Sequence, residues 1–335
     1  MTPGRYQSAL KAPFPWFGGK SRVADVVWQA FGPDIPNYVE PFAGSLAVLL
    51  GRPGGHGPKE TVNDKDHFIS NFWEAVKNDP KGVVEYTLDP VHELLLNKRH
   101  RWLVNQDEFI ERMETETDYY DVKVAGWWVW GKPLWIGGGW CNRVPSPHRK
   151  IPDIFHRKGV HSHKPQLTVR SGIHCPLGSR AARKRAILEW FERLADRLCM
   201  VNVCCKDWTC VVKPSVLGLS DKGSTQECAV FLDPPYDTDI RTGNLYAQDE
   251  VGISADVRAW AIENGDNPRL RIALCGYEGE HVMPANWTVY AWKPNGGLGN
   301  QGKSNTNRFK ERIWFSPHCL PIGGWQRELG LGEEK

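Results

Sequence analysis

Residues 229–236 read Ala-Val-Phe-Leu-Asp-Pro-Pro-Tyr, and this stretch decides the fold of the chain. Its first four residues are a short apolar run, which is typical of a strand buried on both faces in the middle of a parallel sheet. In open α/β sheets, ligands bind outside the carboxyl ends of such strands. Asp233, Pro234, Pro235 and Tyr236 are therefore predicted to line a ligand site.

These four residues suit a substrate that carries an amino group. Asp233 offers a carboxylate that accepts hydrogen bonds from an exocyclic amine. Pro234 and Pro235 have no backbone N–H and a fixed φ, so the turn is stiff and its carbonyls are free to face the amine. Tyr236 offers a flat ring face for a base. Taken alone, the four residues are also compatible with a strand-ending turn that binds nothing.

Two regions of the chain alternate between strand and helix patterns. The first predicts helices over 23–30, 46–50 and 68–76, and strands at 38–39 and 61–62. The second predicts helices over 187–198 and 257–264, and strands at 201–204, 229–232, 270–275, 287–292 and 312–315. This alternation predicts an α/β fold with a Rossmann-like, mostly parallel sheet, to which the last two strands add antiparallel pairing at one edge.

The alternation breaks between the two regions, which predicts an insertion. Residues 1–84 and 180–320 are expected to form one catalytic domain, and residues 321–335 a C-terminal tail. Within the insertion, 85–179, residues 126–140 are rich in Trp and Gly, and residues 144–176 are rich in Pro, His and Arg. We expect this insertion to be an irregular or partly helical module that recognises the target.

Charge is distributed unevenly along the chain, although the net charge is only +3. Between residues 122 and 186 basic residues are frequent and Asp153 is the only acid. Such a segment is typical of a protein that binds a phosphate backbone, and a solvated basic face is the alternative. The candidate DNA-binding residues are Lys132, Arg143, Arg149, Lys150, Arg157 and Lys158.

Four further motifs carry side chains or turns that suit a nucleoside-containing ligand. The turn from Glu40 to Ser45 contains Gly44 and leads into a helix, so a ligand can approach its backbone amides. About twenty residues later, Asp64 closes a strand at the position where nucleoside-binding sheets place an acid for ribose hydroxyls. The remaining two motifs are the aromatic, flexible and cationic segment Trp16-Phe17-Gly18-Gly19-Lys20 and the pair Asp207-Trp208, an acid and a ring for an adenine. Each motif alone is also compatible with a turn, helix cap, surface loop or core position.

In their order along the chain, these motifs resemble the D12-type (Dam-like) DNA adenine-N6 methyltransferases. That family has W-x-G-G-K, then E-P-F-x-G-x-G, an acid after the second strand, a target-recognition insertion and D-P-P-Y. Leu46 stands where the family has its second glycine, which questions the detailed contact at that turn. The resemblance spans about residues 13–77 and 185–316, and residues 310–316 are similar to the closing strand of some phage-encoded members. The insertion matches no recognition module that we can assign.

The resemblance implies a site-specific DNA methyltransferase that transfers a methyl group from S-adenosylmethionine to N6 of a flipped adenine in double-stranded DNA. It implies that Asp233, Pro234, Pro235 and Tyr236 are the catalytic residues, which bind the target base and present it to the methyl donor. The residues implied to contact the cofactor are Trp16, Phe17, Gly18, Gly19, Lys20, Glu40, Pro41, Phe42, Ala43, Gly44, Ser45, Asp64, Asp207, Trp208 and Asp233. Two alternatives stay open, namely an RNA base-amine methyltransferase and a catalytically silent DNA-binding protein with the same fold.

Composition narrows the remaining expectations. A chain of 335 residues with 41% apolar and 24% charged residues is typical of a globular protein, and it contains no apolar run of the roughly 18 residues that cross a bilayer. We expect a cytoplasmic protein of a bacterial or phage-infected cell, with reduced cysteines. We also expect it to be a monomer or weak dimer and to belong to a restriction-modification system. No metal is expected, because the spacing of His156, His161, His163, His174 and Cys175 fits no zinc pattern.

Overall fold

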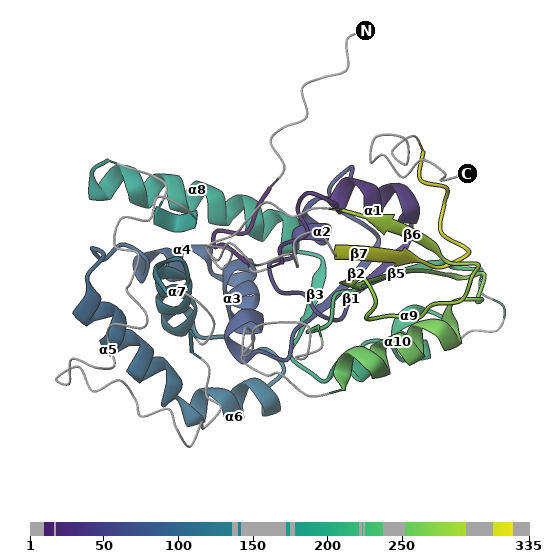
Figure 1. The fold of residues 1–335 in the computed structure, drawn as a ribbon. Coiled ribbons are helices and arrows are strands. Elements are labelled where there is room, and N and C mark those ends of the chain that lie inside the picture. The colour runs from purple at the N-terminus through teal and green to yellow at the C-terminus, as the bar shows by residue number, and fades with distance from the viewer. Residues whose placement is uncertain are drawn as a thin grey trace, which may run out of the picture.

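The computed structural model describes residues 10–16, 18–135, 140–141, 172–174, 178–220, 223, 225–236, 252–292 and 311–323. These residues form a seven-stranded sheet with helices on both faces (Figure 1). The order across the sheet is β3-β2-β1-β4-β5-β7-β6. The strands are β1 (Asn37–Glu40), β2 (Lys59–Asn63), β3 (Val201–Cys204), β4 (Cys228–Leu232), β5 (Leu270–Tyr277), β6 (Thr288–Ala291) and β7 (Glu311–Phe315).

Strand directions confirm the predicted Rossmann-like sheet. β1 pairs in parallel with both β2 and β4, and β3 and β5 continue the parallel pairing outward on either side. β7 runs antiparallel to both β5 and β6, so the antiparallel strand lies second from the edge, where Ile313 pairs with Cys275 and Tyr290. The strand order therefore reverses between β1 and β4, and an open sheet binds ligands at such a point.

Two hydrophobic clusters cover the two faces of the sheet. On β4, Phe231 belongs to the cluster that packs under α1 (Ala24–Phe31), α2 (Ala47–Leu50), α3 (His67–Asn78) and α8 (Arg180–Leu198). Its neighbours Val230 and Leu232 belong to the cluster on the side of α9 (Pro214–Leu217) and α10 (Ile253–Asn264). Burial on both sides explains why this strand is apolar throughout, since each such side chain contributes about 1.5–3 kcal/mol when fully buried.

The first half of the predicted insertion is helical and packs against the sheet domain. Helix α4 (Pro80–Glu85) leads into it, and it contains α5 (Glu93–Val104), α6 (Asp107–Thr115), α7 (Val122–Gly131) and the 3₁₀ helix η1 (Lys132–Leu134). Trp128 of α7 packs in one cluster with Phe72 of α3. Gly126 brings α7 close to α4, because a Cβ there would lie 2.4 Å from the Cβ of Tyr86. Within the tryptophan-rich stretch, Trp128 and Trp130 are therefore core residues of a helix.

The other predictions from composition concern helices, thiols and a possible zinc site. None of the described helices is both long enough and apolar enough to span a bilayer. The cysteines that the structure describes are free thiols. His174 is buried, and its Nε2 lies 2.9 Å from the carbonyl oxygen of Trp130. The other four residues considered for zinc lie outside the described residues.

Candidate active site

The turns that follow β1, β2, β3 and β4 meet at one edge of the sheet, because these four strands are parallel. They line one cavity together with the segment before α1. The predicted residues that line it are Trp16, Gly19, Lys20, Glu40, Pro41, Phe42, Ala43, Gly44, Ser45, Asp64, Asp207, Trp208, Asp233 and Pro235. Motifs separated by up to about two hundred residues in sequence therefore share one cavity.

A few predicted residues lie elsewhere. Gly18, Pro234 and Tyr236 are described but are not part of the cavity lining. Phe17 lies outside the described residues, as do the DNA-binding candidates Arg143, Arg149, Lys150, Arg157 and Lys158.

Asp233 is tied to the start of the chain through Lys20. The ammonium of Lys20 lies 2.9 Å from Asp233 Oδ1 and also donates to the hydroxyl of Tyr236 at 3.0 Å. That hydroxyl lies 3.1 Å from Asp233 Oδ1 and 3.0 Å from Glu311 Oε2. The side chain of Lys20 is only 4% exposed, so its charge is compensated by these acids rather than by water.

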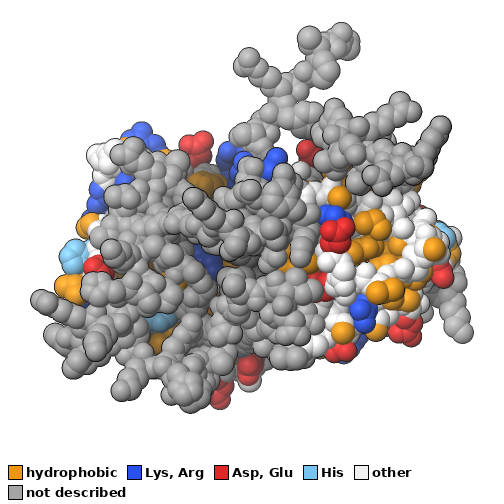
Figure 2. Space-filling model, in the orientation of Figure 1, with side chains coloured by type: hydrophobic (Ala, Val, Ile, Leu, Met, Phe, Trp, Pro, Cys, Tyr) orange, Lys and Arg blue, Asp and Glu red, His pale blue; other side chains and the backbone are white. Residues whose placement is uncertain are grey.

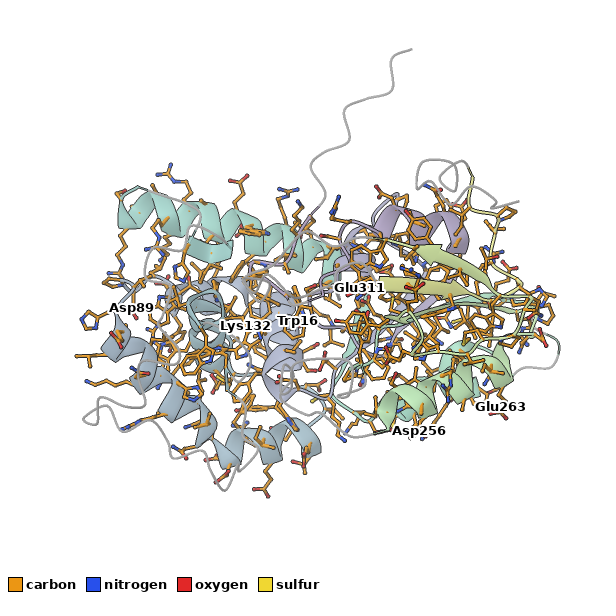
Figure 3. All side chains as sticks on the ribbon, viewed as in Figure 1. Trp16, Asp89, Lys132, Asp256, Glu263 and Glu311 are labelled. Atoms are coloured by element: carbon orange, nitrogen blue, oxygen red, sulfur yellow. The ribbon has the colours of Figure 1, made fainter. Side chains whose placement is uncertain are left out.

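Glu311 is a member of this network that the sequence analysis did not select. It is the first residue of β7 and is buried. Burial raises the pKa of its carboxyl, and the nearby Asp233 charge adds to this rise, while the Lys20 charge opposes it. An acid that opens a strand with three apolar residues at its end, Ile313 to Phe315, was the available signal. Figure 3 labels Glu311 near the middle of the molecule.

The ring and the hydroxyl of Tyr236 both make contacts that fix the side chain. Its ring is 8% exposed and packs edge-on against Tyr277, with a centroid separation of 4.6 Å. Its hydroxyl belongs to the network of Lys20, Asp233 and Glu311. In this arrangement the ring supports the turn after β4 and offers little free face to a base.

The backbone of the turn after β1 has a conformation that lets another group approach it closely. Gly44 has φ 46°, and a Cβ there would lie 2.6 Å from Nε1 of Trp16. Leu46, which replaces the family's second glycine, is fully buried and also has a positive φ, 54°. The turn therefore keeps a conformation that favours glycine although a leucine occupies it, at a backbone cost of about 1–2 kcal/mol.

Asp64 is buried behind this turn and accepts two backbone hydrogen bonds. Its Oδ2 accepts from the amide of Gly44 and its Oδ1 from the amide of Asp66, both at 2.9 Å. The pKa of Asp64 is raised to about 7, chiefly by burial and also by the Asp66 charge, against the lowering effect of the two amides and Lys132. These two amides fix the orientation of the Asp64 carboxylate beside the turn that contains Gly44.

Asn63, which was predicted only as the neighbour of Asp64, joins three of the turns. Its amide donates to the carbonyl oxygen of Pro41 at 3.0 Å and to that of Lys206 at 2.9 Å. Its side-chain oxygen accepts from the amide of Lys206 at 2.9 Å. Asn63 therefore fixes the turns after β1, β2 and β3 relative to one another, which is a positioning role.

Acidic and aromatic side chains line the rest of the cavity. Burial raises the pKa of Glu40 to about 8, and the charge of Asp233 adds to the rise, whereas the hydroxyl of Tyr38, which donates to Glu40 at 2.8 Å, lowers it. Trp208 is nearly buried and faces Phe42 with a centroid separation of 6.2 Å. Asp207 accepts a hydrogen bond from the hydroxyl of Thr209, which lowers its pKa.

Lys132 was predicted to bind DNA, and the structure places it in this cavity. Its ammonium lies 4.5 Å from the ring centroid of Trp16. Other basic residues of the cationic segment, including Arg180, Lys184 and Arg185, belong to the first turns of α8. Figure 2 shows lysine and arginine side chains along the upper left rim, where α8 begins.

Comparison with known proteins tests the resemblance that the order of the motifs indicated. Residues 16–124 match the family model of the D12 class N6 adenine-specific DNA methyltransferases. This match confirms the resemblance over the segment that contains Trp16, Gly44 and Asp64. Asp207 and Asp233 lie beyond the matched residues and enter the same cavity through the sheet. A search of curated proteins gave no match.

The D12-class match sets the chemistry expected of the cavity, since methyltransferases of this family generally use S-adenosylmethionine. No group of three or more His, Cys, Asp and Glu side chains within the described ranges is placed to hold a metal ion. The described groups that line the cavity are carboxylates, lysines, aromatic rings and backbone amides.

Proposed function

We propose that the protein transfers a methyl group from S-adenosylmethionine to N6 of an adenine in double-stranded DNA. The observation that carries this proposal is the convergence of Asp233 with the Gly44 turn and Asp64 in one cavity at the reversal point of the sheet. An amine acceptor and a nucleoside-type site therefore adjoin each other, as transfer between two bound molecules requires.

The residues present fit S-adenosylmethionine. The close approach of Gly44 to Trp16 leaves room at the turn only for a residue without a side chain. Asp64 would accept from the ribose hydroxyls, and Asp207 and Trp208 would bind the adenine end. When bound, this cofactor supplies an electrophilic methyl group on sulfur.

Asp233 would act on the amine of the target base. Adenine N6 is a weak nucleophile because its lone pair is delocalised into the ring. Hydrogen bonds from the amine to the carboxylate of Asp233 and the carbonyl of Pro234 would favour a more tetrahedral nitrogen and stabilise the positive charge that develops on it. As the N–CH₃ bond would form, the S–CH₃ bond would break and release the neutral thioether S-adenosylhomocysteine, and the positively charged N6 would then pass one proton to water. Alignment of two reactants can supply about 7–11 kcal/mol, so no covalent intermediate is needed.

Access to N6 requires the adenine to leave the duplex stack. The flipped base would lie against the turn of Asp233 to Tyr236. Stacking on Tyr236 is the role that the motif predicts, and it requires the ring to turn away from Tyr277, against which it packs here. The basic segment 122–186 would contact the DNA backbone, because neutralising phosphates releases counterions and strengthens binding.

Transfer of tritium from labelled S-adenosylmethionine to unmethylated DNA tests this proposal. The wild-type protein is expected to label adenine-containing duplexes, and Asp233→Ala is expected to lose at least about 10²-fold in rate, because it removes a group that stabilises developing charge. Asp256→Ala serves as the control, since Asp256, labelled in Figure 3, is exposed on α10 and is not among the residues that line the cavity.

Two outcomes of the same assay would support the alternatives instead. Label found in RNA and absent from DNA would indicate an RNA base-amine methyltransferase. Normal binding of the cofactor and of DNA without any transfer would indicate a silent DNA-binding protein.

A further inference from the structure

Lys132 begins the 3₁₀ helix η1, directly after α7. Its side chain is half-buried and lines the cavity beside Trp16, Asp64 and Asp66. The ammonium lies 4.5 Å from the ring centroid of Trp16 and 5.7 Å from that of Trp128, at distances typical of cation–π contacts. Figure 3 labels Lys132 and Trp16.

The ammonium of Lys132 has no hydrogen-bond or ion-pair partner among the described residues; its contacts there are with ring faces. Asp64 and Asp66, the acids whose charges act on Lys132, accept hydrogen bonds from backbone amides. Asp64 accepts from the amides of Gly44 and Asp66, and Asp66 accepts from the amide of Phe68. Desolvation lowers the pKa of Lys132, and the charges of Asp66 and Asp64 oppose this effect.

The other lysines in the cavity lining are already engaged. Lys20 is paired with Asp233 and donates to Tyr236. Lys65 also has an interaction partner. The charges of Asp64 and Asp66 offset part of the desolvation of Lys132, but neither carboxylate forms a direct ion pair with its ammonium. A partly desolvated ammonium that lines a ligand cavity and makes no direct ion pair with the described residues points to an anionic group on the ligand.

S-adenosylmethionine carries one anionic group, the carboxylate of its methionine part, besides two cations, the sulfonium and the ammonium. We propose that Lys132 binds this carboxylate and thereby selects donors that carry it. This inference rests on the proposed function, since it names a contact within the proposed cofactor site. Because Lys132 lies within the inserted region, that region would contribute to cofactor binding as well as to DNA binding.

A comparison of two ligands on two proteins isolates the contact. We would measure Kd by calorimetry for S-adenosylmethionine and for its decarboxylated analogue, which keeps the sulfonium and the amine but lacks the carboxylate. The wild-type protein is expected to prefer S-adenosylmethionine by about tenfold or more, the size of a hydrogen-bonded charge pair. Lys132→Met is expected to bind the two ligands within about twofold of each other, and Lys132→Arg to restore most of the preference.

The matched control is Lys123→Met. Lys123 lies in the first turn of α7, at the opposite end of that helix from Lys132. Its ammonium contacts the rings of Trp102 and Trp127, and it does not line the cavity. Its substitution removes the same charge from the same basic segment and is expected to leave the ligand preference unchanged. Thermal unfolding of each variant would show that it is folded. Lys132→Gln replaces Lys132→Met if the latter does not fold, with the same expected loss of preference.

Three results would overturn the inference. A preference that persists in the Lys132→Met variant would show that another group binds the carboxylate. Equal weakening of both ligands would show that Lys132 only supports the shape of the cavity. Unchanged ligand affinities with weaker, less salt-dependent DNA binding would place Lys132 on a phosphate. In each case the wild-type protein still binds S-adenosylmethionine; failure of the wild-type protein to bind it would instead overturn the proposed function and this inference with it.

Discussion

The ammonium of Lys20 lies 2.9 Å from Oδ1 of Asp233, which joins the first motif of the chain to the turn after β4. The pair is part of a network with Tyr236 and Glu311 that excludes most water from Lys20. Two acids and one lysine share this space, so the lysine is essential for the charge balance of the turn.

Loss of that lysine should destabilise the fold. Lys20→Met leaves Asp233 and Glu311 facing each other without a cation, and we expect the free energy of unfolding to fall by about 3 kcal/mol. Urea denaturation at pH 7 measures this change. Lys81→Met, at an exposed position, is the control and should change stability by less than about 0.5 kcal/mol. Equal stability of the two variants would show that the network contributes nothing.

At Leu46, we expect the usual order of stability of alanine and glycine variants to be reversed. Replacing a buried leucine by alanine leaves a cavity, and we expect a loss of about 2–5 kcal/mol. Glycine normally costs more than alanine, but the φ of 54° at this position favours glycine. Leu46→Gly should therefore be as stable as Leu46→Ala or more so, as measured by thermal and urea unfolding. If Leu46→Gly were clearly less stable, the left-handed backbone at Leu46 would be wrong.

The buried acids predict how stability depends on pH. The pKa of Glu40 is raised to about 8 and that of Asp64 to about 7, so in the folded protein both carboxyls keep their protons at pH values where the unfolded chain has lost them. The folded state therefore binds more protons between about pH 5 and pH 8, and the free energy of unfolding should fall as pH rises through that range.

Urea unfolding at several pH values from 5 to 8.5 measures this slope. Asp64→Asn removes one of the two groups and should flatten it, whereas Asp256→Asn, on the surface of α10, should not. A slope in Asp64→Asn equal to that of the wild-type protein would contradict the raised pKa of Asp64.

Asn63 should matter for cofactor affinity through the positions of the turns. Asn63→Ala removes the hydrogen bonds to Pro41 and Lys206, and we expect weaker binding of S-adenosylmethionine together with a loss of about 2–3 kcal/mol of stability. Calorimetry and urea unfolding on the same samples measure both. Asn78→Ala, an exposed residue at the end of α3, is the control. Unchanged affinity in a destabilised variant would restrict Asn63 to folding.

The sequence predicted the sheet and the edge at which the site lies, because buried strands and glycine turns leave local patterns. Asp64, Asp207 and Asp233 follow β2, β3 and β4, which are parallel strands of the run β3-β2-β1-β4, so their convergence at one edge follows from topology. Glu311 and the role of Asn63 were missed, since each depends on contacts between distant segments. Lys132 was assigned to DNA for its charged neighbours in sequence, but the packing of α7 on α3 turns it toward the cavity.

The most direct test of the central claim is the modified-base content of DNA from cells that express the protein. Nucleoside mass spectrometry should detect N6-methyladenine with the wild-type protein and with Asp256→Ala, and no increase over the empty vector with Asp233→Ala. Long-read sequencing of the same DNA would place the modified adenines in a common sequence context. N6-methyladenine at equal levels with Asp233→Ala and with the wild-type protein would contradict the assignment of Asp233 as the catalytic acceptor, and its absence from both would contradict the proposed activity.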